Sequence, residues 1–243
     1  MVGYRLYRSV VAGATGRVGD ALTRQLLLSP LCSEVHAVSR AEVRGFDGLA
    51  AAAAKLHQHR ADFGAALCGL DASALRGADA AFCVLGARAG WSDTAGVAAA
   101  ERDAALRFAE LCAEAGVPHV SLLSSAWTGA RPRFARLQAE AAEAFAALGT
   151  SGRVRRVSIF RPAVLVDEDG RPLTPLGAPG WASAAHGLLP TAAQFLPTRF
   201  RQVTLSDVAL AMRLNVELCD AAGPVETLDY KDMMQIIGRE DEV

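Results

Sequence analysis

The sequence has few lysines and few aromatic residues. Only two of its 25 basic residues are lysines, Lys55 and Lys231, and aromatic side chains make up 6% of the chain. Acidic and basic residues almost balance, so the formal net charge is -1. Because no strong electrostatic field favours a polyanion or an anionic surface, we expect neither nucleic acid nor a membrane as a partner.

Cysteine is also sparse, and its five copies form no C-x-x-C motif. This wide spacing argues against a structural metal site and a disulfide framework, and it is typical of a reducing compartment. No apolar run approaches the length of a membrane span, and the first expected strand starts too early to follow a secretory signal. We expect a cytoplasmic protein without a metal. Arg5 and Arg8, which have no acidic residues around them, make a mitochondrial location the alternative.

The most informative stretch is SVVAGATGRVG, at residues 9–19. Its apolar start is typical of a strand buried on both faces, and an amphipathic helical pattern follows its glycines. We expect Gly13 to turn the chain sharply out of the strand. Gly16 then lets backbone N–H groups approach a pyrophosphate, and Gly19 lets the helix pack closely on the strand.

A strand, a triple-glycine turn and a helix in this order predict a dinucleotide-binding site. The start of the helix directs free N–H groups and the positive end of the helix dipole at the phosphates. The alternative, an ordinary glycine-rich loop in an alanine-rich chain, does not explain the flanking strand and helix. The residues of this stretch expected to bind the cofactor are Gly13, Thr15, Gly16, Arg17, Val18 and Gly19.

Strand and helix patterns alternate along the chain, without an internal repeat or a linker. This alternation predicts an α/β fold with one doubly wound parallel sheet, in a single Rossmann-like domain over residues 1–243. Proline-rich residues 167–200 are expected to cover the substrate side, and residues 203–243 to complete the fold. The expected strands are 10–12, 34–39, 65–68, 80–86, 119–123, 154–160 and 224–229. The expected helices are 18–26, 45–59, 97–115, 133–148, 207–218 and 230–238, with a short helix or turn at 71–76.

In a doubly wound sheet the ligand binds outside the carboxyl ends of the strands. The expected strand ends therefore place residues 39–40, 86–90, 124–127 and 161–165 beside the glycine turn, along one edge of the sheet. The further residues expected to contact the cofactor are Ser39, Arg40, Leu85, Gly86, Ala87, Ser124, Arg161 and Pro162.

The residues after the second expected strand indicate which dinucleotide fits. A site for NAD places Asp or Glu there to accept hydrogen bonds from the ribose hydroxyls, whereas this chain has Ser39 and Arg40. A hydroxyl and a guanidinium suit a 2′-phosphate, and Arg17 can join them. We therefore predict NADP(H) rather than NAD(H), the alternative being that both arginines are ordinary surface residues. The missing acid also argues against a methyltransferase.

Several stretches together resemble one known family. They cover most of residues 9–215 in the same order: VVAGATGRVG, VHAVSR, GADAAFCVLG, AERDAALRFAELCAEAGVPHVSLLSS, SIFRPAVLV and VTLSDVALAM. On these stretches the chain resembles an atypical short-chain dehydrogenase/reductase, in the branch of the HIV Tat-interacting protein and its fungal mitochondrial relatives. The resemblance implies the fold of an NADPH-binding oxidoreductase. Some members of the branch are described as regulators of transport or transcription rather than as metabolic enzymes.

The resemblance also implies a catalytic pattern, which this chain keeps only in part. The family has Ser after the fifth strand and Tyr-x-x-x-Lys on the next helix, with Tyr as the proton donor and Lys lowering the pKa of that Tyr. Ser124 or Ser125 keeps the serine, but the Tyr and Lys positions fall on Arg136 and Glu140. No tyrosine of this chain is followed by lysine four residues later. The usual proton donor is therefore absent.

Arg136 and Glu140 do not replace that pair as acid and base. Arginine releases no proton near neutrality, and a carboxylate beside it stays charged. The catalytic use left to Arg136 is the stabilisation of an oxyanion. The alternative, which we favour, is a solvated ion ladder of Arg133, Arg136, Glu140 and Glu143 along one helix.

The remaining candidates are histidines, one acid and the tryptophans. We expect His119 to be packed in the core rather than to act as a base. His186 belongs to the expected covering segment, and the less favoured alternative is that it faces the cleft. The tryptophans can stack on a ligand or mark a protein interface. These candidates are His119, His186, Asp103, Trp91, Trp127 and Trp181.

Three functions agree with these observations. The first is an NADP(H)-binding sensor, regulator or scaffold that has lost the reductase chemistry, with a protein partner. The second is an NADPH-dependent oxidoreductase for a small carbonyl or quinone, in which Ser124, Ser125, water or His186 supplies the proton, because hydride transfer itself is the chemistry of the cofactor. The third is a structural subunit or adaptor of a larger assembly. The sequence indicates neither the substrate nor the oligomeric state.

Overall fold

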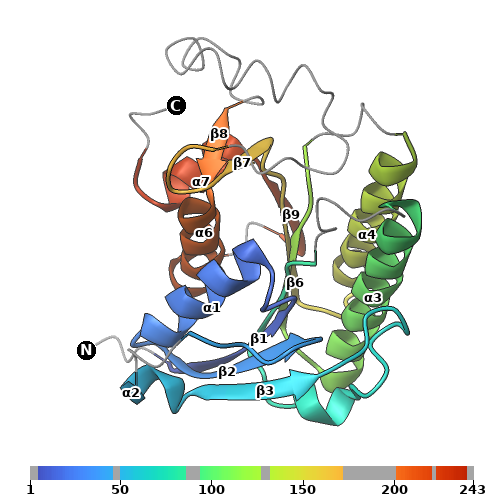
Figure 1. Ribbon diagram of the computed structural model, residues 1–243, viewed down its shortest axis with the longest axis horizontal. Helices are drawn as coiled ribbons and strands as arrows, with labels where there is room; N and C mark the ends of the chain where they lie inside the picture. The colour runs from blue at the N-terminus through green and yellow to red at the C-terminus, as the bar shows by residue number, and fades with distance from the viewer. Residues whose placement is uncertain are drawn as a thin grey trace.

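The computed structural model describes residues 5–45, 50–85, 94–126, 132–171, 201–220 and 223–239, in which a seven-stranded parallel sheet forms the centre (Figure 1). The strands lie in the order β3-β2-β1-β4-β5-β6-β9. Their bounds are β1 (Tyr7–Ala12), β2 (Cys32–Ser39), β3 (Leu56–Arg60), β4 (Ala80–Cys83), β5 (His119–Leu123), β6 (Arg156–Phe160) and β9 (Val225–Leu228). A separate two-stranded sheet pairs β7 (Val164–Val166) with β8 (Gln202–Thr204).

Helices cover both faces of the large sheet (Figure 1). One face carries α1 (Arg17–Leu28), α6 (Leu205–Leu218) and α7 (Tyr230–Ile236), and the other carries α3 (Thr94–Ala115) and α4 (Pro132–Thr150). The short elements are α2 (Ala50–Ala53) and the 3-10 helix η2 (Ala72–Leu75). The strand order reverses at β1, which lies between β2 and β4. The expected α/β fold with a doubly wound parallel sheet is therefore confirmed.

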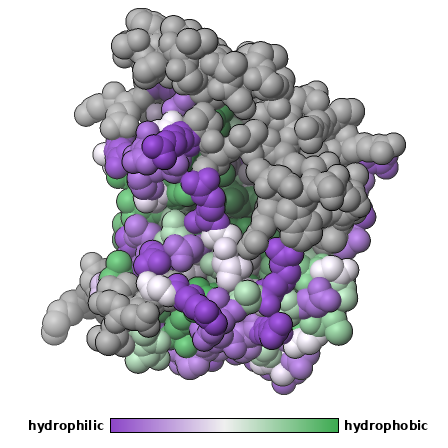
Figure 2. All heavy atoms as spheres, in the orientation of Figure 1, coloured by the Kyte–Doolittle hydropathy of each residue, from purple (hydrophilic) through white to green (hydrophobic). Residues whose placement is uncertain are grey.

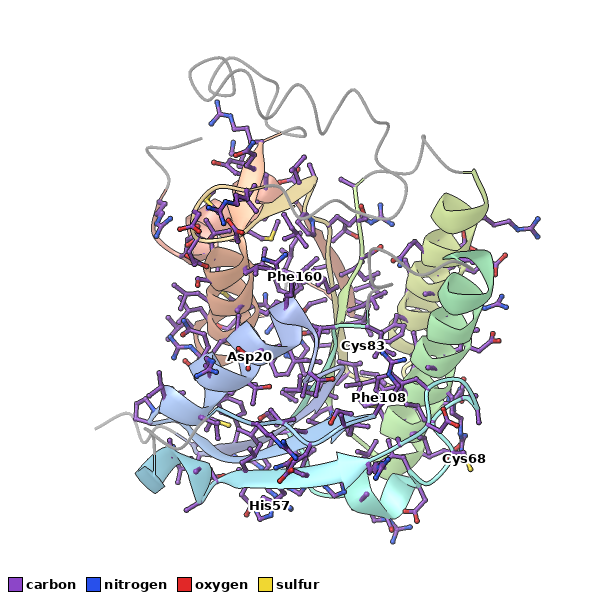
Figure 3. All side chains as sticks on the ribbon, viewed as in Figure 1. Asp20, His57, Cys68, Cys83, Phe108 and Phe160 are labelled. Carbon is purple, nitrogen blue, oxygen red and sulfur yellow. The ribbon has the colours of Figure 1, made fainter. Side chains whose placement is uncertain are left out.

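Successive residues of the central strands point into two different apolar layers. Val10 belongs to the layer that contains Phe108 of α3, whereas Val11 belongs to the layer that contains Leu22 of α1. Figure 3 shows Phe108 between the sheet and α3, and Phe160 on the side of α1 and α6. Burial on both faces explains why these strands appear in the sequence as continuous apolar runs.

The described surface carries few large apolar side chains. The exposed ones among the described residues are Leu6, Leu28 and Leu218. On the face shown in Figure 2, hydrophilic and hydrophobic residues are interspersed over the described elements. Within the described part of the chain, no helix is both long and apolar enough to cross a membrane.

One edge of the sheet differs from the sequence prediction. The third strand is β3, at Leu56–Arg60, so the prediction of a strand at 65–68 is wrong. The helix predicted over 45–59 is also too long, because its described part contains only the four residues of α2. The alanines of this region favour a helix, and the polar sequence LHQHR lacks the apolar run by which the other strands were found. It forms a strand because β2 offers it hydrogen bonds, from Val35–Leu56 to Ser39–Arg60.

The residues expected to form that strand instead form turns. Ala66 and Leu67 have positive φ angles of 46° and 62°. An isolated bridge joins Asp62 to Cys68 around them. Left-handed backbone at two successive positions is incompatible with a strand. The covering segment expected at 167–200 lies outside the described residues from 172 onward and stays a prediction.

The glycine turn holds α1 close against the end of β1. A Cβ atom at Gly19 would lie 2.1 Å from the carbonyl oxygen of Gly13. Gly13 has a φ of +93°, and a Cβ there would lie 3.0 Å from the carbonyl oxygen of Val84. These two glycines are therefore required by the close approach of helix and strand and by the left-handed turn, respectively.

Replacing Gly19 by alanine should destabilise the fold. The added methyl would overlap the backbone of Gly13, which belongs to the same buried turn, so we expect Gly19→Ala to lower the free energy of unfolding by about 3 kcal/mol. The measurement is urea unfolding followed by circular dichroism. Gly223→Ala is the matched control, because a Cβ at Gly223 meets no atom within 4 Å. Equal midpoints for the two variants would contradict the packing argument.

Candidate functional site

The glycine turn lies at the carboxyl end of β1, where the strand order reverses. Gly16 precedes α1 in an extended conformation and makes no side-chain cap, as it has no side chain. The N–H of Asp20 is bonded to the carbonyl of Gly16 at 2.7 Å, so the helix ladder begins there. The N–H groups of Arg17, Val18 and Gly19 have no acceptor within the helix. An anion at the start of α1 is stabilised by them and by the helix dipole.

An open cleft of about 460 Å³ lies beside this turn. Its lining comes from the glycine turn and α1, from the segment that follows β2, and from the start of α6. The lining residues are Thr15, Gly16, Arg17, Asp20, Glu42, Val43, Arg44 and Leu205. A Cβ at Gly16 would lie 3.1 Å from the carbonyl oxygen of Gly13 and would crowd the turn at the cleft wall. The glycines, the helix start and the cleft together fit the phosphates and a ribose of a dinucleotide.

Both arginines that line the cleft have a carboxylate partner. Arg17, with 59% of its side chain exposed, lies 3.5 Å from the carboxylate of Asp167. Arg44 lies 3.0 Å from Glu42, and both of these side chains are largely exposed. Exposed ion pairs of this kind are weak, so a bound phosphate can compete for either guanidinium.

Sequence reasoning did not single out Glu42 and Arg44. It stopped at Ser39 and Arg40, where β2 ends, whereas the chain beyond them returns along the cleft. The available signal was the local sequence RAEVR, which carries two more charged side chains directly after the strand. The direction of that segment depends on Gln58 of β3, whose side-chain oxygen accepts a hydrogen bond from the N–H of Val43 at 2.8 Å.

Ser39 and Arg40 lie near the cleft but are not among the residues that line it. Ser39 is buried, and its hydroxyl donates a hydrogen bond to the carbonyl of Ala41 at 2.5 Å. The guanidinium of Arg40 lies over the ring of Phe63, 5.9 Å from its centroid, at the distance of a cation–π contact. The Ser39 hydroxyl therefore stabilises the backbone bend, and the guanidinium of Arg40 packs on Phe63.

The other expected contact residues lie at the same sheet edge. Ser124 follows β5 and is 9% exposed, and its N–H donates a hydrogen bond to the carbonyl of Phe160 at 2.8 Å. The N–H of Ala126 bonds to the carbonyl of Pro162 at 3.1 Å, so the two chain segments continue side by side beyond the sheet. Arg161 is exposed at this edge.

Leu85 also lies against the glycine turn. Its Cδ2 would be 3.1 Å from a Cβ placed on Gly13. Ser125 is half-buried next to Ser124. The expected residues outside the described part of the chain are Gly86, Ala87, Trp91, Trp127, Trp181 and His186.

The positions where the family resemblance places Tyr and Lys hold an ion pair. The guanidinium of Arg136 lies 2.9 Å from Glu140, one turn along α4. Arg102 of α3 contacts the other oxygen of the same carboxylate at 2.6 Å. The hydrogen bond from Arg136, with that from Arg102, holds the pKa of Glu140 below its usual range. The expected ladder on α4 is therefore present for Arg136 and Glu140, and it crosses to α3 through Arg102.

This cluster has no group that releases a proton near neutrality. Arg136 has 82% of its side chain exposed, and guanidinium groups stay protonated. Asp103 is paired with Arg102 at 2.7 Å, so it extends the ion network instead of facing a ligand alone. Screening by water limits what such exposed pairs contribute to stability.

His119 is a packed residue at the amino ends of the strands, opposite the carboxyl ends where the glycine turn lies. It begins β5, is 7% exposed, and its Nε2 lies 2.8 Å from the hydroxyl of Ser158. Burial, reinforced by the positive charge of Arg156, lowers the pKa of His119 to about 3. The ring is buried and neutral at pH 7, which confirms the expectation that His119 is packed in the core.

Comparison with solved structures reveals the same architecture in several enzymes. MoeE5 in complex with UDP-glucuronic acid and NAD is 19% identical, with 92% of this chain and 76% of that chain covered and a TM-score of 0.64. Vestitone reductase from alfalfa (Medicago sativa L.) is 20% identical, with 92% and 76% covered and a TM-score of 0.60. A short chain dehydrogenase family protein from Francisella tularensis subsp. tularensis SCHU S4 is 11% identical, with 95% and 100% covered and a TM-score of 0.60.

This chain has the fold of the short-chain dehydrogenases and reductases. No protein-family profile matches the sequence. No curated protein matches it either. At identities of 11 to 20% the likeness concerns the fold, in which the glycine turn and the cleft occupy the carboxyl edge of the sheet.

The neutral state of His119 predicts a specific loss of stability in acid. Its pKa is about 3 in the folded chain against 6.5 for the free side chain, so protonation favours the unfolded state. The stabilisation is complete above pH 6.5 and falls by about 1.4 kcal/mol per pH unit as the pH decreases from there toward 3. Relative to the wild type, His119→Gln should show a shallower decrease of the unfolding free energy between pH 6.5 and 4.5.

Urea unfolding at several pH values measures this difference. Ser158→Ala is the control, because it keeps the buried imidazole and should keep the steep pH dependence. Parallel curves for the wild type and His119→Gln would mean that His119 is already protonated in the folded protein, against its burial.

Proposed function

We propose that this chain binds NADP(H) beside the glycine turn and acts as a sensor, regulator or scaffold rather than as a reductase. One observation carries this proposal. The glycine turn and its cleft are intact, whereas Arg136 and Glu140, at the positions of the resembled Tyr and Lys, are paired with each other at 2.9 Å.

Binding of a nicotinamide dinucleotide is supported by the geometry at the start of α1. Gly16 lines the cleft, and the first-turn N–H groups of Arg17, Val18 and Gly19 have no acceptor within α1, as phosphate binding requires. MoeE5, with the same fold, holds NAD in its structure. The proposed site therefore uses the turn for the pyrophosphate and the segment after β2 for the adenosine ribose.

The preference for the phosphorylated cofactor rests on the arginines. Arg17 and Arg44 line the cleft, and Arg40 lies at the end of β2. Three guanidinium groups near the expected ribose favour a 2′-phosphate through charge-assisted hydrogen bonds. Glu42 is the observation in favour of NAD(H), since a carboxylate there can accept from the ribose hydroxyls.

The regulatory role rests on the missing proton relay. Ser124 or Ser125 keeps the resembled catalytic serine, and a serine hydroxyl alone is a poor acid. Members of the resembled Tat-interacting branch are described as regulators, which agrees with this role. The second candidate is an NADPH-dependent oxidoreductase for a small carbonyl or quinone, favoured by the position of Ser124 and Ser125 at the carboxyl end of β5. The third, a structural adaptor, requires no cofactor.

Cofactor preference is testable by fluorescence titration of NADPH and NADH. We expect NADPH to bind more tightly, and we expect Arg40→Glu to lower the affinity ratio by about tenfold or more, because one charge-assisted hydrogen bond contributes about 1.5–3 kcal/mol. Arg107→Gln is the control, since Arg107 is paired with Glu114 on the outside of α3 and should not affect either affinity. An unchanged ratio in Arg40→Glu would overturn the assignment of this residue.

Loss of catalysis is testable on the complex with NADPH. We expect the bound cofactor to stay reduced, by its absorbance at 340 nm, during incubation with aldehydes, ketones and quinones. Consumption that disappears in Ser124→Ala would instead establish the oxidoreductase. Absence of binding of either cofactor would leave the adaptor.

A further inference from the structure

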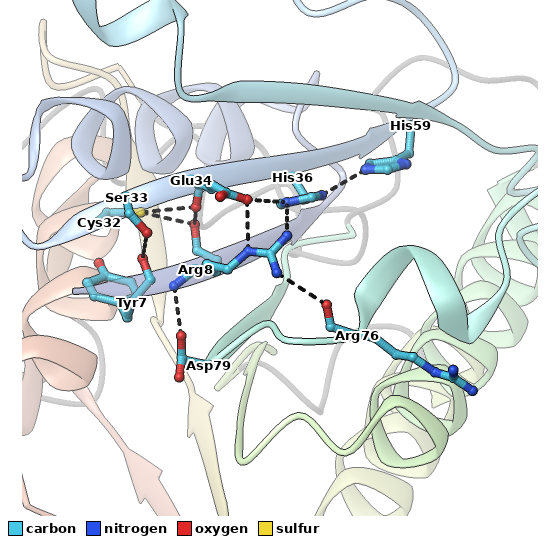
Figure 4. A network of polar contacts seen from close by, with 10 residues as sticks. Tyr7, Arg8, Cys32, Ser33, Glu34, His36, His59, Arg76 and Asp79 are labelled. Atoms are coloured by element: carbon cyan, nitrogen blue, oxygen red, sulfur yellow. Dashed lines mark hydrogen bonds and ion pairs between the residues drawn. The ribbon is translucent and has the colours of Figure 1, made fainter. Parts of the chain in front are cut away.

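Three histidines gather on β2 and β3, at the edge of the sheet. His36 of β2 is paired in register with His57 of β3. His59 follows His57 by two residues and Glu34 precedes His36 by two, so all four side chains lie on one face of the sheet. Figure 4 shows Glu34, His36 and His59 in a continuous polar network with Arg8 of β1.

The imidazole rings are in close contact. The ring centroid of His36 lies 4.9 Å from that of His57 and 5.2 Å from that of His59. His36 Nδ1 is 2.9 Å from His59 Nε2, and His36 Nε2 is 3.3 Å from an oxygen of Glu34. One ligand atom each of Glu34, His36 and His57 lies within 4.8 Å of the others.

The distance between Glu34 and His36 is that of two ligands in a metal site. Two ligand atoms that each lie 2.0–2.1 Å from a tetrahedral zinc ion are about 3.3–3.4 Å apart. The separation of His36 Nε2 from Glu34, 3.3 Å, equals this spacing. His57 is exposed, so its ring can rotate to complete the set without disturbing the core.

We propose that Glu34, His36 and His57 form a binding site for a divalent transition-metal ion of the zinc, cobalt, nickel and copper group. Nitrogen and carboxylate ligands suit these ions, and three protein ligands leave one position for water. His59 orients the ring of His36 through the contact between His36 Nδ1 and His59 Nε2, in the place that a carboxylate, a carbonyl or a water takes beside most metal-bound histidines.

Arg8 is the competitor of the metal at this site. Its Nε donates a hydrogen bond to Glu34 at 2.8 Å, and its Nη2 lies 3.2 Å from His36 Nε2. The guanidinium thus occupies the same two ligand atoms as the metal would. It can withdraw toward the carbonyl of Arg76, 3.5 Å from its Nη1, because the side chain is 37% exposed. Metal binding therefore requires the Arg8 guanidinium to leave Glu34 and His36 and to keep its contact with the carbonyl of Arg76.

The site is separate from the dinucleotide cleft. Glu34 and His36 lie in the first half of β2, whereas the cleft uses residues beyond its carboxyl end. The expectation of no metal rested on cysteine spacing, and these ligands are histidines on two strands, one of which was expected to be a helix. The proposal is independent of the proposed function, so either can fail alone.

Titration of the full, tag-free chain with Zn²⁺ tests the proposal, with Co²⁺ absorption as a report on coordination. We expect saturation at one equivalent at micromolar protein and the visible absorption of a four-coordinate Co²⁺ site. His57→Gln should weaken Zn²⁺ binding by about tenfold or more, since one direct ligand is lost. Arg8→Gln should strengthen it by about threefold or more, because a competing positive charge is removed.

Cys68→Ser is the control, because Cys68 is an exposed thiol outside the cluster and an alternative zinc ligand. It should leave Zn²⁺ binding unchanged. Thermal unfolding of each variant without metal shows that the fold is kept. Imidazole NMR signals should shift for His36 and His57 on addition of Zn²⁺ and stay fixed for His119. Unsaturable binding, equal affinity in His57→Gln, or loss of binding in Cys68→Ser would overturn the site.

Discussion

The contact between Gly13 and Gly19 is the constraint on which the arrangement of this chain depends. A single methyl group at Gly19 would overlap the carbonyl of Gly13. The chain can therefore pass from β1 into α1 in this geometry only if residue 19 has no side chain. That closeness buries Leu22 against the sheet and lets α6 pack on α1. It also aims the start of α1 at the cleft. Core packing and the direction of the helix start toward the cleft are therefore set by the same backbone crossing.

The two halves of an oxidoreductase site depend on different parts of this fold. The phosphate cradle is backbone geometry between β1 and α1, so it survives most changes of side chain. The resemblance places its Tyr and Lys at two side-chain positions on α4. In this chain Arg136 and Glu140 stand there and join α4 to Arg102 of α3, so these positions form a link between two helices.

Buried elements of this chain could be predicted from the sequence, and its edge could not. β1, β4 and β5 are apolar because both of their faces are covered, and that requirement is visible in the residues themselves. β3 is polar and becomes a strand only through the hydrogen bonds of β2, which no local pattern reveals. Within the candidate site, the glycines were identifiable from spacing. Three other features depend on how separate elements meet and could not be predicted. They are the inward turn of the Ser39 hydroxyl, the position of Glu42 in the cleft wall and the contact of Arg102 with α4.

The polarity of β3 has a further consequence for the chain as a whole. An edge strand of a parallel sheet presents unpaired N–H and C=O groups, to which a strand of another molecule can add. The described face of β3 carries imidazoles with a carboxylate and a guanidinium beside them. Polar and charged side chains on and beside an edge strand disfavour such pairing with an apolar strand, because they would lose water to it. The histidine-rich edge is thus a poor template for an apolar strand of another molecule.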